Sequence, residues 1–130
     1  LVGLGRRMLD LTVGYVSERR QFGVPIGSQQ AVKHPLADAA MKLRFAAPAV
    51  YAAAWSVATG AETAERDVSM AKALASDAAR FTGRQALQCH GAIGYTVEYD
   101  LHLYMKRAWA LARRHGDARF HVRRVSSSLR

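Results

Sequence analysis

The sequence predicts an all-α protein that folds as an up-and-down four-helix bundle. Apolar residues recur at intervals of three and four over most of the 130 residues, which is typical of amphipathic helices. Glycine and proline lie mostly between these stretches, so short connections are expected, and helices with short connections pack as antiparallel neighbours. We expect one domain over residues 1–130, cut from a longer chain because there is no initial Met.

The first helix is expected over about residues 1–19, with Gly23 among the residues that end it. The second is expected to run to about residue 59. Ser28 is suited to cap it, but Pro35 is best tolerated in a first turn, so a start near residue 34 or a bend is the alternative. The predicted apolar stripe of this helix comprises Val32, Leu36, Ala39, Leu43, Ala46 or Ala47, Val50, Ala54 and Val57, with bulk from Tyr51 and Trp55.

The third helix is expected over about residues 62–89, closed by Gly91, and a fourth is expected to start near Glu98. Asp117 is suited to cap a short last helix. The polar stripe of the third helix is predicted to comprise Glu65, Ser69, Lys72, Ser76, Arg80 and Arg84, and its apolar side Val68, Ala71, Leu74, Ala75, Ala78 and Phe81. The fourth helix has Leu101, Met105, Ala108 and Ala112 in phase.

Composition and charge narrow the class of protein. The net charge of +9 is compatible with an anionic cofactor or an acidic partner, but no aromatic residues alternate with the arginines as a base-stacking surface requires. A basic module that binds nucleic acid is therefore a remote alternative. The single cysteine excludes an internal disulfide and is compatible with a reducing, cytoplasmic location. No metal site and no membrane span are expected.

Two separate segments carry residues suited to a phosphate-bearing ligand. The first is Gln88-Cys89-His90-Gly91-Ala92-Ile93-Gly94-Tyr95, in which glycines permit close approach of a ligand and the glutamine amide can orient it. The second is Arg19-Arg20-Gln21-Phe22-Gly23, where an arginine offers forked donors to a diphosphate. Gln30 adds a further amide. Each segment alone is more simply read as a helix end exposed to solvent.

Together, these segments resemble the C-terminal domain of acyl-CoA dehydrogenases. The order and spacing of the motifs match that family over essentially the whole chain. The matching residues are Glu18-Arg19-Arg20-Gln21-Phe22-Gly23, Gln30, Leu36-Ala37-Asp38, Gln88 to Tyr95, and Glu98-Tyr99.

The resemblance implies a four-helix bundle, FAD as the cofactor and an acyl-CoA substrate. It implies that Arg19 and Gln21 contact the FAD pyrophosphate, that Phe22 packs against the cofactor nearby, and that Gln30 also contacts FAD. It further implies that Gln88, Cys89, His90, Gly91 and Ala92 line the adenosine end. In the family these contacts reach FAD held mainly by a neighbouring subunit, so a homo- or hetero-oligomer, dimer or tetramer, is implied. Ala92 stands where a second glycine is usual in the family, and its methyl group narrows the approach.

The catalytic position departs from the family. Its reaction removes two hydrogens from an acyl-CoA: a carboxylate takes the α-proton and the flavin takes the β-hydride. Counted without gaps from Gln88, His115 falls where the catalytic Glu is expected. Three interpretations are open: a non-catalytic subunit of a heteromeric dehydrogenase, as in bacterial enzymes for steroid side chains; a carboxylate upstream of Leu1; or His115 as the base. A flavin-dependent monooxygenase of the same fold is another alternative.

Overall fold

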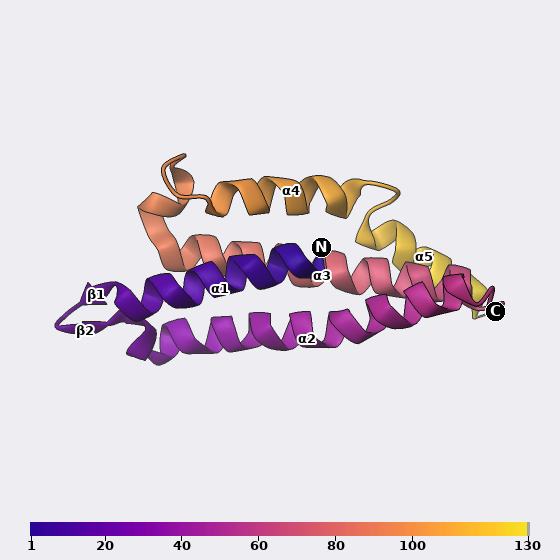
Figure 1. Ribbon diagram of the computed structural model, residues 1–130, viewed down its shortest axis with the longest axis horizontal. Helices are drawn as coiled ribbons and strands as arrows, with labels where there is room; N and C mark the ends of the chain where they lie inside the picture. Colours follow the sequence, from indigo (N-terminus) through magenta and orange to yellow (C-terminus); the bar gives the residue numbers. More distant parts are fainter. Residues whose placement is uncertain (130) are drawn as a thin grey trace.

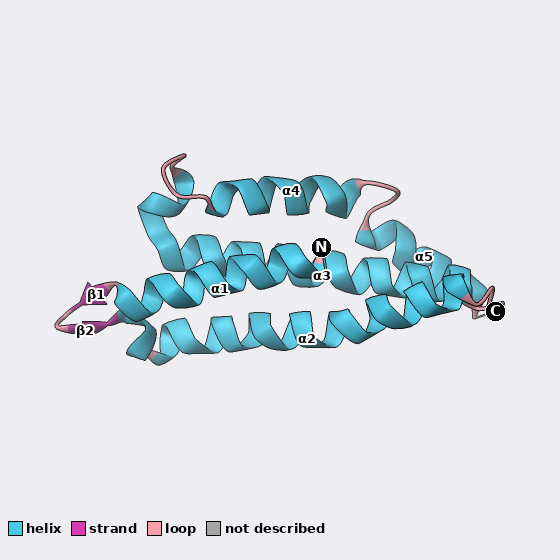
Figure 2. Ribbon diagram, in the orientation of Figure 1, coloured by secondary structure: helices cyan, strands magenta, loops and turns pink. Residues whose placement is uncertain are grey.

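The computed structural model describes residues 1–129 and shows a bundle of helices (Figure 1), in which the described strands form one small hairpin (Figure 2). The predicted all-α architecture is confirmed. In chain order the elements are α1 (Val2–Glu18), β1 (Arg20–Gln21), β2 (Val24–Pro25), the 3₁₀ helix η1 (Ile26–Ser28), α2 (Gln30–Ala58), α3 (Ala64–His90), the 3₁₀ helix η2 (Gly91–Tyr95), α4 (Leu101–Arg113) and α5 (Ala118–Ser128).

Helices α1 to α4 alternate in direction, and α5 continues past the end of α4 (Figure 1). The third helix is central, because it contacts each of the other four. Helices α2 and α3 are the longest, with 29 and 27 residues, and they extend beyond the first turn of α1. Along that extension α5 packs against α3, so the bundle is completed by different helices at its two ends.

Because α3 is central, the residues that it buries differ from those that its sequence predicts. Ser69 and Ser76 are both 1% exposed, so their assignment to a solvent-facing stripe is wrong. Leu74 and Val68, predicted for the apolar side, are 46% and 40% exposed. A helix with neighbours on several sides buries its small residues, whatever their polarity, because small side chains permit close approach. The other small residues buried in α3 are Ala71, Ala73, Ala75, Ala78, Ala79, Thr82, Gly83 and Ala86.

The larger side chains of the main hydrophobic cluster come from α1 and α4. Met8 and Leu101 are completely buried, and the predicted phase of α4 is confirmed by the burial of Met105, Ala108 and Ala112. Burying a side chain of this size contributes roughly 1.5–3 kcal/mol relative to leaving it exposed. These residues pack against Ala79 and Ala86 of α3 and form the main hydrophobic cluster of the molecule.

Helix α2 begins at Gln30 with Gln29 as its N-cap, close to the start predicted from Ser28, so the alternative start near residue 34 is wrong. Ser28 is not the cap, because its hydroxyl donates to the carbonyl of Pro25. Pro35 and Pro48 both lie inside it. Towards its C-terminal end the buried positions are Ala53 and Ser56 in place of the predicted Ala54 and Val57, while Tyr51 and Trp55 are 62% and 72% exposed. The exposed aromatics therefore add no bulk to the core.

Between α1 and α2 the chain forms a tight antiparallel hairpin, in which Arg20 pairs with Pro25 and Gln21 with Val24. The two turn residues, Phe22 and Gly23, have φ of 52° and 80°. A two-residue hairpin turn with positive φ at both positions matches the right-handed twist of its strands. Phenylalanine is an uncommon residue in that conformation, and here its side chain is 93% exposed.

The other predicted helix ends are confirmed. Gly91, with φ of 61°, follows the last residue of α3, and its N–H donates to the carbonyl of Leu87. The carboxylate of Asp117 accepts from the backbone N–H of Phe120 at 2.8 Å, which caps α5. Among residues 1–129, no helix combines the length and apolarity that crossing a membrane requires.

Candidate functional site

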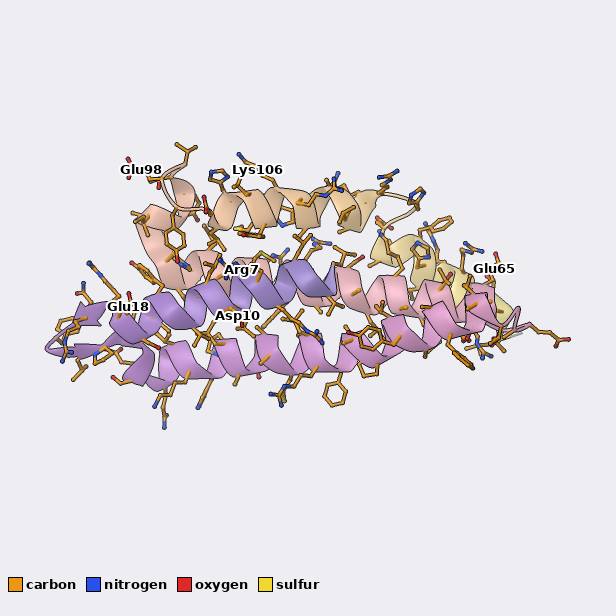
Figure 3. All side chains as sticks on the ribbon, viewed as in Figure 1. Arg7, Asp10, Glu18, Glu65, Glu98 and Lys106 are labelled. Carbon is orange, nitrogen blue, oxygen red and sulfur yellow. The ribbon has the colours of Figure 1, made fainter. Side chains whose placement is uncertain are left out.

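Both predicted ligand-binding segments lie at one end of the bundle. The hairpin that follows α1, the start of α2 and the end of α3 with η2 all lie on the left of Figure 1. Figure 3 marks this end with Glu18 beside the hairpin and Glu98 after η2, whereas Glu65 lies at the opposite end. Residues that are about 70 positions apart in the chain are thus brought to a common region.

Three rings join α1 to the end of α3. Tyr15 stacks on His90 with centroids 4.4 Å apart, and Tyr99 lies 4.7 Å from the His90 ring and 6.1 Å from the Tyr15 ring. The backbone N–H of Arg19 donates to the carbonyl of Tyr15 at 2.9 Å. Arg19 is therefore one helical turn from this cluster, and Gln88 is two residues from His90. The cluster thus holds the two segments at a fixed distance and orientation.

His90 turns inward from the segment in which it was predicted to contact a ligand. Its side chain is 4% exposed, and its Nδ1 lies 2.7 Å from the carbonyl oxygen of Ala86. A carbonyl can only accept, so Nδ1 carries the hydrogen and, in the neutral ring, Nε2 does not. Nε2 is buried and has no hydrogen-bond partner among residues 1–129. Burial lowers the pKa of His90 below its ordinary value, with the contact to Ala86 acting in the opposite direction.

Most polar side chains of the two predicted segments are exposed and make no hydrogen bond within the described residues. Arg19, Gln21, Gln30 and Gln88 are exposed, and their side chains make no hydrogen bond to any other described residue. Arg20 differs, because its Nη2 donates to the carbonyl of Gly23 at 3.0 Å and braces the hairpin. The guanidinium of Arg19 and the three glutamine amides are therefore free to bind a ligand. The guanidinium of Arg20 instead stabilises the hairpin.

The remaining predicted residues of the second segment offer mainly backbone. Gly91 and Ala92 are exposed, and a Cβ added to Gly91 would meet no atom within 4 Å, so this turn is open to solvent. Gly94 is buried, and an added Cβ would lie 3.0 Å from both the Cβ of His90 and the Cδ1 of Leu87. Cys89 is half-buried, and burial raises the pKa of its thiol, which makes it a poor nucleophile.

His115 lies far from this end. It sits in the loop between α4 and α5, and the 13 residues of α4 span about 20 Å at 1.5 Å per residue. Its side chain is exposed and its φ is 60°. The structure therefore separates His115 from Arg19 and Gln88, so a ligand that contacts all three from one chain would have to extend along the bundle.

The loop that carries His115 is held by two residues that the sequence did not single out for this role. Lys72 of α3 donates through Nζ to the carbonyls of Leu111, Ala112 and Gly116, at 3.1, 3.1 and 3.0 Å. The carbonyls of Leu111 and Ala112 are orphan acceptors in the last turn of α4, and that of Gly116 belongs to the loop after it. Burial lowers the pKa of Lys72, but three carbonyls still surround its ammonium group.

His121, in α5, is the second of these residues. It is 4% exposed; its Nε2 lies 3.0 Å from the carbonyl of His115 and its Nδ1 lies 3.3 Å from the hydroxyl of Ser69. The carbonyl requires a donor, so Nε2 carries the hydrogen and Nδ1 accepts from the serine. Nothing in the sequence separates His121 from the exposed His34, because its burial depends on α5 folding back onto α3.

Comparisons with known proteins identify the family. The family model described as "Acyl-CoA dehydrogenase, C-terminal domain" matches residues 1–129. The chain belongs to the acyl-CoA dehydrogenase family. The Acyl-CoA dehydrogenase IpdE2 of Mycolicibacterium smegmatis is 40% identical over 128 residues, which cover 98% of this chain and 39% of that protein. The chain thus spans about two fifths of the length of this curated relative.

Solved structures agree with the family assignment. The ChsE4-ChsE5 complex from Mycobacterium tuberculosis has a chain with a TM-score of 0.92 and 31% identity, matched over 98% of this chain and 35% of that one. The FAD complex of PigA gives a TM-score of 0.90 at 28% identity, over 98% of this chain and 33% of the other. FAD is therefore bound by a structural neighbour of this chain.

The residues present at the hairpin end suit the family cofactor. A diphosphate needs a cation and neutral donors, and the exposed Arg19, Gln21 and Gln88 offer both. A flat adenine needs an open apolar or backbone surface, which the exposed turn at Gly91 and the exposed ring of Phe22 can present. In residues 1–129, no three His, Cys, Asp or Glu side chains come together as a metal site.

Proposed function

We propose that this chain is the C-terminal domain of an FAD-dependent acyl-CoA dehydrogenase subunit and that it completes an FAD site across a subunit boundary. The observation that carries the proposal is the Tyr15–His90 stack, which joins the segment of Arg19 to the segment of Gln88 at one end of the bundle. Family membership supports the proposed cofactor and the proposed reaction class, the α,β-dehydrogenation of an acyl-CoA thioester.

Each residue at this end has a distinct part in the proposed site. The guanidinium of Arg19 binds the pyrophosphate, and the amides of Gln21 and Gln30 donate to it from the hairpin and the start of α2. Phe22, held at the hairpin tip with 93% of its surface exposed, covers an apolar part of the cofactor. Gln88, with the backbone of Cys89, Gly91 and Ala92, faces the adenosine. His90 acts through its stack and positions this segment from inside. Bound FAD supplies the hydride acceptor of the reaction.

The test compares two single variants with a matched control in the complete protein. Arg19→Ala and Gln88→Ala are expected to lower the flavin content of the purified protein and to speed FAD release, because both remove donors. Arg107→Ala, an exposed arginine of α4, is expected to leave both properties unchanged. Flavin absorbance, and fluorescence of released FAD, measure the outcome. Unaltered flavin retention in the Arg19 and Gln88 variants would refute the proposed site.

A second candidate is that the chain belongs to a non-catalytic subunit of a heteromeric dehydrogenase. It is favoured by His115, which an ungapped count from Gln88 aligns with the family's catalytic carboxylate. Lys72 and His121 make the contacts to the backbone of its loop. The ChsE4-ChsE5 structure shows a family relative as a complex of two different proteins. A histidine without a catalytic task is compatible with such a subunit.

The variant His115→Ala tests whether His115 is the base or has no catalytic part. In a non-catalytic subunit the variant keeps both flavin content and the rate at which acyl-CoA reduces the flavin of the assembled enzyme. If His115 is the base, flavin content is kept but flavin reduction falls by at least 100-fold, which corresponds to the lower range for a lost general base. Stopped-flow reduction of the flavin separates these results, with His34→Ala as the exposed control.

A further inference from the structure

The last turn of α5 carries a run of serines that directly follows a pair of arginines. The order along the chain is Arg123-Arg124-Val125-Ser126-Ser127-Ser128, and all the serines in it are exposed. Protein kinases select their substrates by charge pattern, and one class of them requires arginine on the N-terminal side of the hydroxyl that it phosphorylates. Ser127 has Arg124 three residues before it and Arg123 four residues before it.

Burial excludes two other serines that have a cation at a similar spacing. Ser69 follows Arg66 by three residues and Ser76 follows Lys72 by four, but both serines are 1% exposed in the interior of α3. The end of α5 differs, because the last turn of an exposed helix of 11 residues opens at little cost in free energy. Flanking positive charge and access to the hydroxyl therefore coincide at the end of α5.

The same turn borders a groove that is rich in arginine. This groove lies between α5 and the start of α3 and has a volume of about 620 Å³. Its lining includes Arg66, Arg123, Arg124, Ser127 and Ser128. Glu65, which Figure 3 labels, lies at this end of the bundle, opposite the proposed FAD site. A group attached to Ser127 is therefore placed among several guanidinium groups.

The arginines of the groove differ in what they already bind. Arg124 pairs with Glu65 across the groove. Arg66 contacts the carboxylate of its neighbour Asp67 at 3.4 Å. In the part of the chain that the structure describes, the guanidinium of Arg123 forms no ion pair and no hydrogen bond with another residue. Arg123 is therefore the cation of the groove that is most available to an added anion.

The position of Ser127 on α5 directs its hydroxyl towards this cation. Ser127 lies one helical turn after Arg123, and its hydroxyl donates to the carbonyl of Arg123 at 3.0 Å. Glu62 and Glu65 also line the groove and act against an anion, but the arginines outnumber them and Arg124 already pairs with one of them. The groove thus keeps a positive balance of charge.

We propose that Ser127 is a phosphorylation site and that Arg123 and Arg66 hold its phosphate in this groove, which fixes α5 to α3. The hydroxyl oxygen of Ser127 attacks the γ-phosphorus of a nucleoside triphosphate bound by a serine/threonine protein kinase. The bond from that phosphorus to the leaving diphosphate breaks, and the hydroxyl proton passes to the kinase. The product carries a charge of about −1.5 to −2 and three acceptor oxygens, enough for two guanidinium groups.

Two effects of such a phosphate oppose each other. A negative charge at the C-terminal end of a helix is unfavourable, but this effect is small at an exposed site. Charge-assisted bonds to guanidinium groups are stronger, and the one from Arg66 comes from α3, so the packing of α5 on α3 is tightened. Helix α5 also carries His121, which contacts the carbonyl of His115. Phosphorylation therefore also restrains the loop between α4 and α5.

The first test locates the phosphate on the complete protein. Incubation with a serine/threonine kinase that selects basic substrates, together with ATP and Mg²⁺, is expected to yield a phosphopeptide that tandem mass spectrometry maps to Ser127. Ser127→Ala is expected to remove this phosphate, and Ser126→Ala is expected to keep it. Arg124→Gln is expected to lower the initial rate by about 10-fold or more, and Arg107→Gln, on α4, to leave it unchanged. Phosphate on Ser126 alone, only outside α5, or on no serine would overturn the proposal.

The second test measures whether the groove holds the phosphate. In the phosphorylated protein, ³¹P NMR is expected to show a phosphate pKa below its ordinary value of about 6, because guanidinium groups favour the dianion. Arg123→Gln keeps Arg124 for the kinase and is expected to return this pKa towards 6. Hydrogen exchange of the α5 amides is expected to slow by about 10-fold on phosphorylation of the parent protein. An ordinary pKa or unchanged exchange would overturn the proposal, because the phosphate then extends into solvent.

Discussion

The rings of Tyr15 and His90 stack with centroids 4.4 Å apart, and this pair joins α1 to the end of α3. Because the histidine is buried with an unpartnered Nε2, the folded protein holds it neutral. Protonation of His90 in acid is therefore expected to disturb the stack that positions the two segments of the proposed cofactor site.

Replacement of His90 by phenylalanine is expected to reduce the loss of stability in mild acid. Burial lowers the folded-state pKa of His90 below 6.5, so the unfolded chain takes up a proton that the folded chain excludes. Stability from this residue is complete above pH 6.5 and decreases as the pH falls towards the lowered pKa. Thermal unfolding between pH 7.5 and pH 5, a range that spans the ordinary histidine pKa of about 6.5, measures how steeply the stability falls with pH. His34→Gln, at an exposed site, should keep the parental slope; the same slope in His90→Phe would contradict the prediction.

Replacement of Lys72 by methionine is expected to destabilise the α4–α5 loop. The ammonium group donates to three backbone carbonyls at 3.0–3.1 Å, and methionine keeps the bulk but removes every donor. Hydrogen bonds to a charged group contribute about 1.5–3 kcal/mol, so a loss of about 2 kcal/mol in the free energy of unfolding is expected. Urea titration measures it. Lys106→Met, exposed on α4, should change stability by less than about 0.5 kcal/mol.

Two glycine-to-alanine variants are expected to have opposite effects. Gly116 has φ of 98°, and an added Cβ would collide with the ring of Phe120, so Gly116→Ala should destabilise the protein by about 2 kcal/mol or more. Gly14 is an exposed position within α1 where an added Cβ meets nothing within 4 Å. Gly14→Ala should therefore stabilise by about 0.5–1 kcal/mol. Equal effects of the two variants would show that backbone conformation is not what selects glycine at position 116.

Replacement of Asp67 by asparagine is expected to weaken the α2–α3 connection at neutral pH and to flatten its acid dependence. Its carboxylate accepts from the hydroxyl of Thr63 at 2.7 Å and from that of Ser56 at 2.8 Å. These bonds, with that of Thr63 the largest cause, lower the pKa of Asp67 below 3.8. The stability they add is present above pH 3.8 and is lost as the pH falls through the lowered pKa. Thermal unfolding from pH 7 into acid tests this, with the exposed Asp77→Asn as control; equal curves for Asp67→Asn and the parent would contradict it.

The fold class could be predicted because it rests on local information. The phase of Leu101, Met105 and Ala108, the glycine after α3 and the capping Asp117 each act within a few residues of chain. Two starts of α2 were left open for the same reason: local rules count Pro35 as a helix breaker, but the packing of the whole 29-residue helix outweighs one missing hydrogen bond.

The candidate site likewise contains some residues that the sequence identifies and others that it does not. Arg19, Gln21, Gln30 and Gln88 are identifiable from the sequence by their chemistry and motif, and their ligand contacts stay predictions. The supporting residues are not identifiable from the sequence. Tyr15 and Lys72 contact parts of the chain that are 39 or more residues away. His121 contacts a loop whose position depends on the packing of α5.

By itself, the sequence determined the helices, the ends marked by Gly91 and Asp117, the family and the residue types offered to a cofactor, because periodicity, turn residues and motifs are read along the chain. Only the tertiary structure decided which residues meet. It turned His90 inward, buried Ser69 and Ser76, exposed Trp55 and moved His115 to a separate loop. The physical reason is that burial depends on how many neighbours surround a helix, and that number is set by the packing of segments that are distant in sequence.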